Sequence, residues 1–296
     1  DFAGVGTPYP DSSSSRGYPP ARSSTSHRSL DPIDSTRGSD QAGSCKQMAH
    51  NVGTALDKAG VTRIIFIRHA NAAPPGGKKK AEYNGIHDWQ KDDQMRPLTD
   101  KGKQQGAVAR VWYEKDIGVP TNKILITSGA RRASETLQVL CEEKAKKSIF
   151  SAFCTSSNTV GMAADMELVG SLHPAGIAPK CEALFDTHGY APLAKFYGME
   201  GGEEAFAEYG DVVCKELEAV AERVAMKKGN TLSCFGHAVF LNAAAMQLIK
   251  TWGAEEATVK QLVDLDLGEA EGILIERAGD KCSIKHMSVR PHALWA

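Results

Sequence analysis

Three short and mostly apolar runs, each followed by a helical pattern, constrain the fold more than any other feature of this chain. An apolar run without alternation is typical of a strand that is buried on both faces of a sheet. The predicted strands cover residues 63–67, 123–127 and 231–235, and the helical patterns that follow them cover residues 99–115, 131–146 and 238–250. This alternation predicts an α/β fold with three layers, in which helices cover both faces of a mainly parallel sheet.

The remaining patterns complete this picture and suggest one domain boundary. We expect a helix over 44–58, a strand over 166–172, a long amphipathic helix over 202–227 and two closing strands over 269–277 and 281–288. Between residues 148 and 201, outside that strand, we expect loops with short helices. Residues 1–43 are rich in Ser, Pro, Gly and Arg and have few large apolar side chains, which predicts a disordered segment. Residues 44–296 would then form one domain.

The overall composition argues against several classes of partner. A formal net charge of −1 gives no general attraction to nucleic acid or anionic membranes, and no apolar run is long enough to span a bilayer. Seven dispersed cysteines without a CxxC pair fit a reducing compartment, so we expect a cytoplasmic protein. An organelle-targeting remnant within residues 1–43 stays open, although the acidic residues there argue against it. No zinc-like ligand spacing is present, so we expect neither metal nor cofactor.

Cationic side chains follow all three predicted strands. Arg68-His69 follows the first strand, Arg131-Arg132 comes shortly after the second, and His237 follows the third. Each motif by itself is more simply explained as a local hydrogen-bonding or surface feature. Together they lie at the carboxyl ends of parallel strands, where ligands of open α/β sheets bind. Helix N-termini and arginine side chains both favour phosphate oxygens. The pattern therefore predicts a phosphoryl site that needs no metal.

The order of these motifs resembles the histidine phosphatase superfamily, which includes the phosphoglycerate mutases. The resemblance spans residues 61–290 and rests on the motifs RHA at 68–70, RPLTDKGKQQ at 96–105, TSGARRASETL at 127–137 and FGHAVF at 235–240. It implies a phosphoglycerate mutase-like fold. It also implies that His69 is the nucleophile and that Arg68, Arg132 and His237 bind the phosphoryl group. Arg96 would reach the phosphate or the substrate, with a surface arginine as the equal alternative.

The details favour a phosphatase over a mutase. Ala70 and the stretch 172–176 resemble the phosphohistidine-phosphatase branch, whereas the longer RHGxSxxN and ERxYG patterns of the mutases are absent. We therefore expect a metal-independent phosphatase that hydrolyses a phosphomonoester or phosphohistidine through a phosphohistidine intermediate on His69. Its substrate would be a phosphorylated small molecule or a phosphoprotein. A phosphoglycerate mutase-type phosphotransferase and a non-catalytic phosphate-binding scaffold remain the alternatives.

The proton donor for the leaving group is the least defined part of this prediction. Relatives that release alcohols place an acid on the loop after the strand that follows the arginine-bearing helix. In this chain that position holds His173, and Asp186 is the second candidate; an ordinary loop residue is an equal explanation for His173. Because aryl phosphates and phosphohistidine have better leaving groups, they depend less on an acid. The sequence thus predicts that they are preferred over alkyl phosphates.

Overall fold

The computed structural model describes most of the chain beyond residue 54. The described residues are 55–56, 58–74, 93–117, 123–141, 166–174, 177–224, 231–278 and 281–288. The expected disorder of residues 1–43 lies outside them, as do most of the expected helix at 44–58 and residues 75–92 of the loop before Arg96. The domain boundary at residue 43 therefore stays a prediction.

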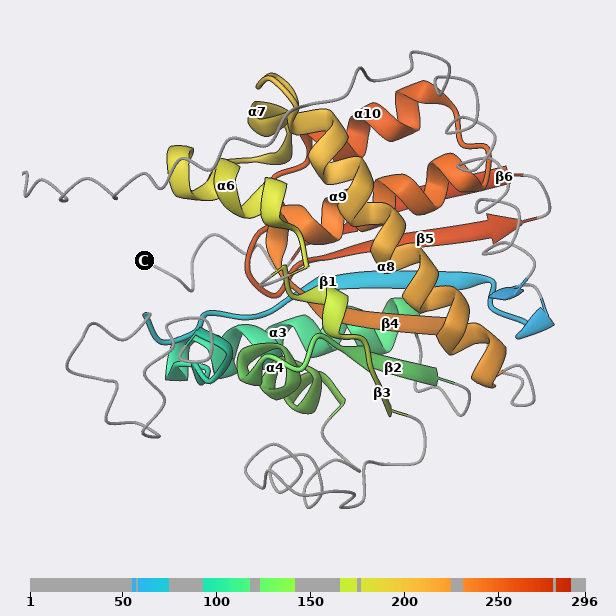
Figure 1. Cartoon of the computed structure of the whole chain (residues 1–296). Helices are drawn as coiled ribbons and strands as arrows, with labels where there is room; N and C mark the ends of the chain where they lie inside the picture. The colour runs from blue at the N-terminus through green and yellow to red at the C-terminus, as the bar shows by residue number, and fades with distance from the viewer. Residues whose placement is uncertain are drawn as a thin grey trace, which may run out of the picture. The chain divides into compact units, whose positions relative to one another are not determined.

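A six-stranded sheet forms the centre of the structure (Figure 1), with the strand order β3-β2-β4-β1-β5-β6. The strands are β1 (Arg63–Arg68), β2 (Lys123–Thr127), β3 (Met166–Leu168), β4 (Thr231–Gly236), β5 (Gly272–Ala278) and β6 (Lys281–Met287). Strand β4 is parallel to its neighbours β1 and β2, and β2 is parallel to β3. The pairs of β1 with β5 and of β5 with β6 are antiparallel. The prediction of a mainly parallel sheet is therefore confirmed.

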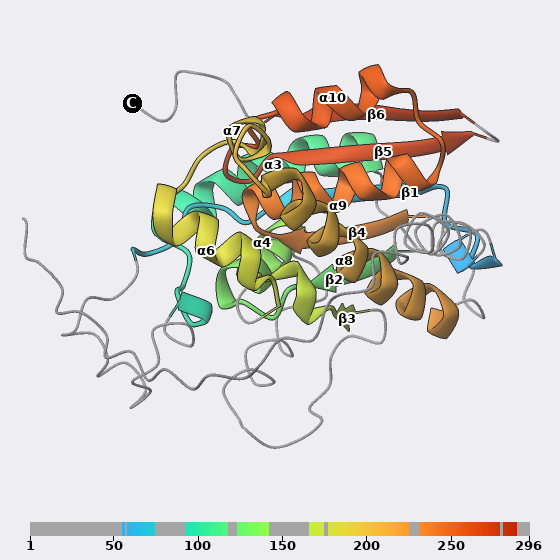
Figure 2. The same ribbon diagram turned by 45° about the horizontal axis from the view of Figure 1, so that its top comes forward.

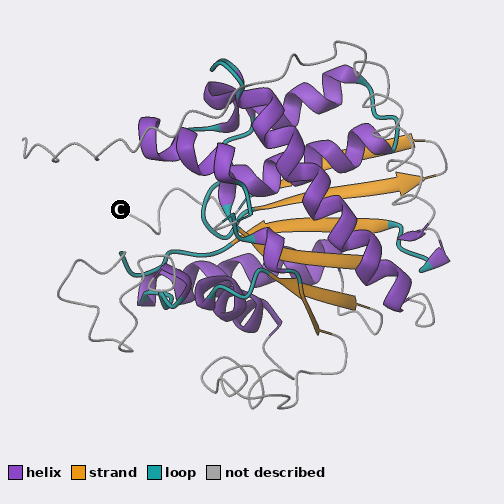
Figure 3. Ribbon diagram, in the orientation of Figure 1, coloured by secondary structure: helices purple, strands orange, loops and turns teal. Residues whose placement is uncertain are grey.

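Helices cover both faces of the sheet (Figure 2), and alternate residues of β1 belong to the cores on opposite faces. Ile64 and Phe66 belong to the core shared with α8 (Gly202–Val224) and α9 (Ala238–Thr251). Ile65 and Ile67 instead pack with α3 (Asp100–Ile117) and α4 (Arg131–Cys141). Because both faces of the strand are buried, the run must be continuously apolar. The predicted three-layer α/β architecture is confirmed (Figure 3).

Three shorter helices complete the layer on the α8 and α9 side. They are α6 (Pro179–His188), α7 (Leu193–Tyr197) and α10 (Glu256–Asp264). Cys181, Phe196 and Leu262 join them to the same core. Helix α10 falls in a stretch for which the sequence pattern had suggested no element. The predicted helices at 131–146 and 202–227 are described as far as Cys141 and Val224.

The strand predicted over 166–172 is too long and requires correction. Strand β3 ends at Leu168, and residues Gly170–Leu172 form a short 3-10 helix, η2. The Leu172 carbonyl oxygen lies against Gly236, where an added Cβ would be only 3.1 Å from it. Glycine is therefore needed for this close approach. The turn moves the chain off the sheet edge and brings His173 over the end of β4.

Candidate active site

The register of the parallel strands brings the three cationic motifs together. Arg68 at the end of β1 is aligned with Gly236 at the end of β4, and Thr127 at the end of β2 is aligned with Phe235. The His69 amide donates to the Gly236 carbonyl oxygen over 3.0 Å, which continues the pairing one residue past the strand. The motifs that follow β1, β2 and β4 consequently meet at one edge of the sheet.

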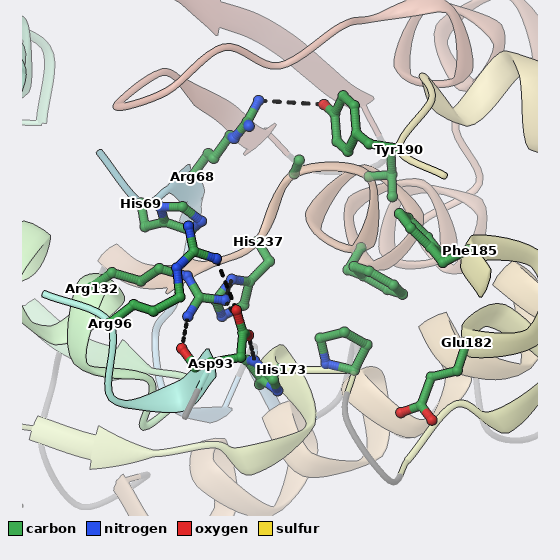
Figure 4. A pocket seen from close by; sticks show the side chains of 14 residues that line it. Arg68, His69, Asp93, Arg96, Arg132, His173, Glu182, Phe185, Tyr190 and His237 are labelled. Atoms are coloured by element: carbon green, nitrogen blue, oxygen red, sulfur yellow. Dashed lines mark hydrogen bonds and ion pairs between the residues drawn. The ribbon is translucent and has the colours of Figure 1, made fainter. Parts of the chain in front are cut away.

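A cavity of about 420 Å³ lies at this edge (Figure 4). All six residues that the sequence singled out for the site line it: Arg68, His69, Arg96, Arg132, His173 and His237. The other lining residues are Asp93, Pro174, Glu182, Phe185, Tyr190, Ala238, Val239 and Phe240. The second candidate acid, Asp186, lies on α6, and its side chain falls outside the described part of the chain.

His69 is in the form that can act as a nucleophile. Its Nδ1 lies 2.8 Å from the Ala70 carbonyl oxygen, which can only accept, so Nδ1 carries the hydrogen and Nε2 keeps its lone pair. Burial lowers the pKa of His69 well below its usual value, and the charges of Arg132, Arg68 and Arg96 add to this effect. The imidazole is therefore neutral at neutral pH.

Thr136 connects the loop that carries His69 to the helix that carries Arg132. Its hydroxyl oxygen accepts a hydrogen bond of 2.9 Å from the Ala70 amide and donates one of 2.7 Å to the Arg132 carbonyl oxygen. Gly129, with φ of 79°, provides the left-handed turn between β2 and α4. These contacts place Arg132, which is 4% exposed, in the first turn of the helix and inside the cavity wall.

Asp93 lies among the cations of the site, although the sequence analysis did not single it out. Its carboxylate accepts hydrogen bonds of 2.8 Å from Arg96, 2.9 Å from Arg132 and 3.2 Å from His173 Nε2. Burial opposes ionisation, but the His173 hydrogen bond and the charges of both arginines lower the pKa of Asp93 well below its usual range. This position therefore already holds an anionic group. Its spacing of three residues before Arg96 is the only sequence signal for it.

His237 supports Arg132 through a neutral ring. Nδ1 accepts a hydrogen bond of 3.2 Å from Arg132, so Nε2 carries the hydrogen and donates to the Ser128 hydroxyl over 3.1 Å. Burial lowers the pKa of His237 well below its usual value, with Arg132 as the next cause. The ring centroid lies 5.1 Å from that of His69 and 4.6 Å from that of His173. In this arrangement His237 orients Arg132 rather than contributing a positive charge.

Two arginines of the site retain hydrogen-bonding capacity. Arg68 donates to the Leu267 carbonyl oxygen over 2.6 Å and to the Tyr190 hydroxyl over 3.3 Å. Within the described residues, the buried Nε atoms of Arg68 and Arg132 have no hydrogen-bond partner. Buried donors are normally satisfied, so unpaired guanidinium Nε atoms beside a cavity suit a ligand with several acceptor oxygens.

Other chemistries find little support in the part of the chain that the structure describes. No group of three His, Cys, Asp or Glu side chains there is arranged to hold a metal ion. The five described cysteines, namely Cys141, Cys181, Cys214, Cys234 and Cys282, are all free thiols. None of the described helices combines the length and the apolar character needed to cross a membrane.

The chain matches no protein-family model and no curated protein sequence, whereas solved structures do match it. A putative phosphohistidine phosphatase SixA from Agrobacterium tumefaciens is 12% identical, with 77% of this chain and 97% of that chain covered and a TM-score of 0.37. A phosphoglycerate mutase from Bacillus anthracis is 11% identical, covering 78% and 95%, with a TM-score of 0.44. A phosphoserine phosphatase from Entamoeba histolytica is 15% identical, covering 77% and 98%, with a TM-score of 0.39.

Because the identities and TM-scores are low, the function proposed below rests on the geometry of the site.

Proposed function

We propose that the protein is a phosphatase of the histidine phosphatase superfamily, with one catalytic domain over residues 44–296. It transfers the phosphoryl group of a phosphomonoester or phosphohistidine to His69 and then to water, without a metal ion. One observation carries this proposal: a neutral His69 with a free Nε2 lone pair lines the same cavity as three arginines. This combination supplies both a nucleophile and the positive charge that phosphoryl transfer requires.

The first step forms a bond between His69 Nε2 and phosphorus and breaks the bond to the leaving oxygen. Arg68, Arg96 and Arg132 stabilise the negative charge on the equatorial oxygens. His173, which we propose as the proton donor, gives a proton to the leaving oxygen. Water then attacks the phosphohistidine and gives a proton back to His173, the bond between nitrogen and phosphorus breaks, and inorganic phosphate leaves.

Phosphoryl binding has to compete with Asp93. The Asp93 carboxylate takes one donor from each of Arg96 and Arg132 and one from His173. A phosphoryl dianion offers more acceptor oxygens and more negative charge than a carboxylate, and it can also use the unpaired Nε donors of Arg68 and Arg132. We therefore expect Asp93 to withdraw when substrate binds, which frees the two arginines and His173 for the reacting group.

The alternatives are less well supported by the site. A mutase must bind a phosphorylated hydroxy acid, whose carboxylate needs a cation of its own. Yet Arg96 and Arg132 are paired with Asp93, and Arg68 points to Tyr190 (Figure 4). A non-catalytic scaffold would be expected to lack a reactive group, whereas His69, Arg68, Arg132 and His237 are all present. The natural substrate, either a phosphorylated small molecule or a phosphoprotein, stays open at this level.

Trapping the phosphoenzyme tests the proposal. Rapid quenching with a ³²P-labelled aryl phosphate should label the wild-type protein, and the label should be stable to base and labile to acid, as a phosphoramidate is. His69→Ala should remain folded, carry no label and release at least about a thousandfold less phosphate.

Turnover should also persist in a metal chelator and be inhibited by vanadate. A base-labile adduct, an active His69→Ala protein or activity that depends on an added divalent ion would each refute the assignment.

A further inference from the structure

The cavity has a second wall that the phosphoryl chemistry does not use. It is formed by Pro174, Phe185, Val239 and Phe240, with Tyr190 at the rim. Figure 4 shows Phe185, Tyr190 and Glu182 on the side opposite Arg96 and Arg132. Sequence analysis suggested no role for these apolar residues. We refer to Pro174, Phe185, Val239, Phe240 and Tyr190 together as the aromatic wall.

The aromatic wall is built into the hydrophobic core. The Phe185 ring on α6 stacks on Phe240 of α9, with centroids 5.2 Å apart and planes inclined by 21°. Phe196 lies 4.7 Å behind Phe185, and Tyr209 meets Phe240 edge-on at 5.0 Å. Aromatic contacts of this kind are stabilising, so the wall keeps its shape without a ligand. A preformed apolar surface is what a small-molecule site usually presents.

The aromatic wall begins directly beside the reactive groups. Pro174 follows His173 in the chain, and Phe240 lies three residues after His237 in the first turn of α9. With a rise of about 1.5 Å per residue, this separation is about 5 Å along the helix. A ring joined to the phosphoryl group through a single oxygen can reach this surface, whereas a short alkyl group would leave most of it uncovered.

One carboxylate, that of Glu182, lies on the α6 side of the cavity (Figure 4). Among the arginines that line the cavity, Arg68 contacts this side, because its guanidinium carbon lies 5.5 Å from the centroid of the Tyr190 ring. Tyr190 already accepts a hydrogen bond from Arg68 through its hydroxyl. A carboxylate or a second phosphate placed beside Glu182 would be repelled by its negative charge. An uncharged apolar group meets no such penalty.

We propose that the substrates are aryl phosphates, including the phosphotyrosine side chain, and that the aryl ring packs against Phe185 and Phe240. This inference rests on the proposed function and specifies its substrate class. In the reaction the aryl oxygen leaves phosphorus, takes a proton and departs as a phenol. A phenol is a better leaving group than an alcohol. An aryl phosphate therefore depends less on a proton donor in the site.

Ligands that cannot react separate recognition of the ring from catalysis. Calorimetry on the whole chain should give a dissociation constant for phenylphosphonate about tenfold lower than for ethylphosphonate, a difference of the size that an aromatic contact supplies. In Phe185→Leu the ratio should fall to about two, while the affinity for orthophosphate stays unchanged. Phe196→Leu is the matched control. It removes a ring from the same stack but does not line the cavity, so its melting temperature should fall while the ratio remains at the wild-type value.

A second variant does not depend on repacking the core. Glu182→Lys places a cation on the aromatic wall and should improve binding of 3-phosphonopropionate, which carries a carboxylate, by about fivefold relative to phenylphosphonate. Unchanged relative affinity would mean that the leaving group does not extend toward Glu182 and would overturn the placement.

Turnover measurements distinguish whether the aryl group belongs to a small molecule or to a protein. Free phosphotyrosine and a phosphotyrosyl peptide should both be hydrolysed faster than phosphoserine in the same context, and the faster of the two shows whether the natural substrate is small or a protein. Equal phosphonate affinities, or preferred turnover of a phosphohistidine peptide, would overturn the inference. Ring-selective binding without any turnover would instead refute the proposed function and leave only the recognition of the ring by the aromatic wall.

Discussion

The two walls of the cavity are built on opposite physical principles. We refer to Arg68, His69, Arg96, Arg132 and His237 together as the cationic wall. Most of these side chains follow the ends of three parallel strands, and hydrogen bonds and the Asp93 carboxylate hold them in place. The aromatic wall is the outer surface of a packed core between α6 and α9. The first wall provides chemistry that is the same for every phosphoryl group. The aromatic wall contacts the part of the substrate beyond the phosphoryl group, which differs between substrates. We therefore assign catalysis to the cationic wall and selectivity to the aromatic wall.

The two walls also differ in their cost to folding. His69, His237 and Arg132 are held in a setting whose burial disfavours their charged forms. Phe185 and Phe240, by contrast, bury apolar surface and stabilise the fold while they line the cavity. A variant of the cationic wall should therefore change activity more than stability. A variant of the aromatic wall should change stability together with selectivity.

The largest effect in this comparison should come from Arg132. Replacing it with Ala removes donors from the transition state and should lower kcat/KM by about 10²–10³ for every substrate, because the contact is to the phosphoryl group. Arg132→Lys should recover only part of this loss, since Lys lacks the bidentate geometry. Steady-state kinetics with an aryl and an alkyl phosphate provide the measurement.

Arg131→Ala is the matched control for this variant. Arg131 is the neighbour of Arg132 on α4, pairs with Glu135 over 2.7 Å and does not line the cavity. We expect it to change kcat/KM little. A greater loss from Arg131→Ala than from Arg132→Ala would show that the wrong arginine has been assigned to the cationic wall.

A smaller and more selective effect should come from His173, which lies where the two walls meet. If His173 supplies the proton, His173→Ala should slow alkyl esters by about 10² and aryl esters much less. A plot of log kcat against leaving-group pKa should accordingly become steeper than in the wild type.

His188→Ala, at the exposed end of α6, is the control and should leave the slope unchanged. Equal slopes in the wild type and His173→Ala would remove His173 as the acid. The same plot for Asp186→Ala would then test the second candidate.

The smallest effect should be a dependence of stability on pH that comes from the cationic wall alone. The pKa values of His69 and His237 lie well below the usual 6.5 in the folded protein. As the pH falls below about 6.5, the unfolded chain binds protons that the folded one does not, so the free energy of unfolding decreases. Melting temperatures measured between pH 7.5 and pH 5.5 should show this decrease.

Two variants attribute the decrease to its source. His69→Asn should weaken the pH dependence, because one of the two histidines no longer titrates on unfolding. Phe185→Leu should lower the melting temperature by the same amount at both ends of the pH range. A wild-type melting temperature that rises on acidification, or a Phe185→Leu effect that changes with pH, would contradict the separation of the two walls.

The sequence by itself determined the layered fold and most of the cationic wall. A strand buried on both faces must be continuously apolar, so β1, β2 and β4 could be recognised from residues next to one another in the chain. Parallel strands also bring their carboxyl ends to one edge, so motifs that follow them could be expected to meet. Arg68, His69, Arg132 and His237 were found in this way, and the structure places all four around one cavity.

Only the tertiary structure revealed Asp93 at the centre of the cations and Phe185, Phe240 and Tyr190 on the facing wall. It also decided that the chain turns at Gly170–Leu172 and brings His173 beside His237. None of these features has a local signature, because each depends on side chains far apart in sequence: Asp93 on Arg132, Phe185 on Phe240, and Leu172 on Gly236. A local sequence pattern indicates which side of a segment is exposed to water and which side is buried. The residues that the buried side contacts are determined by the packing of the whole domain.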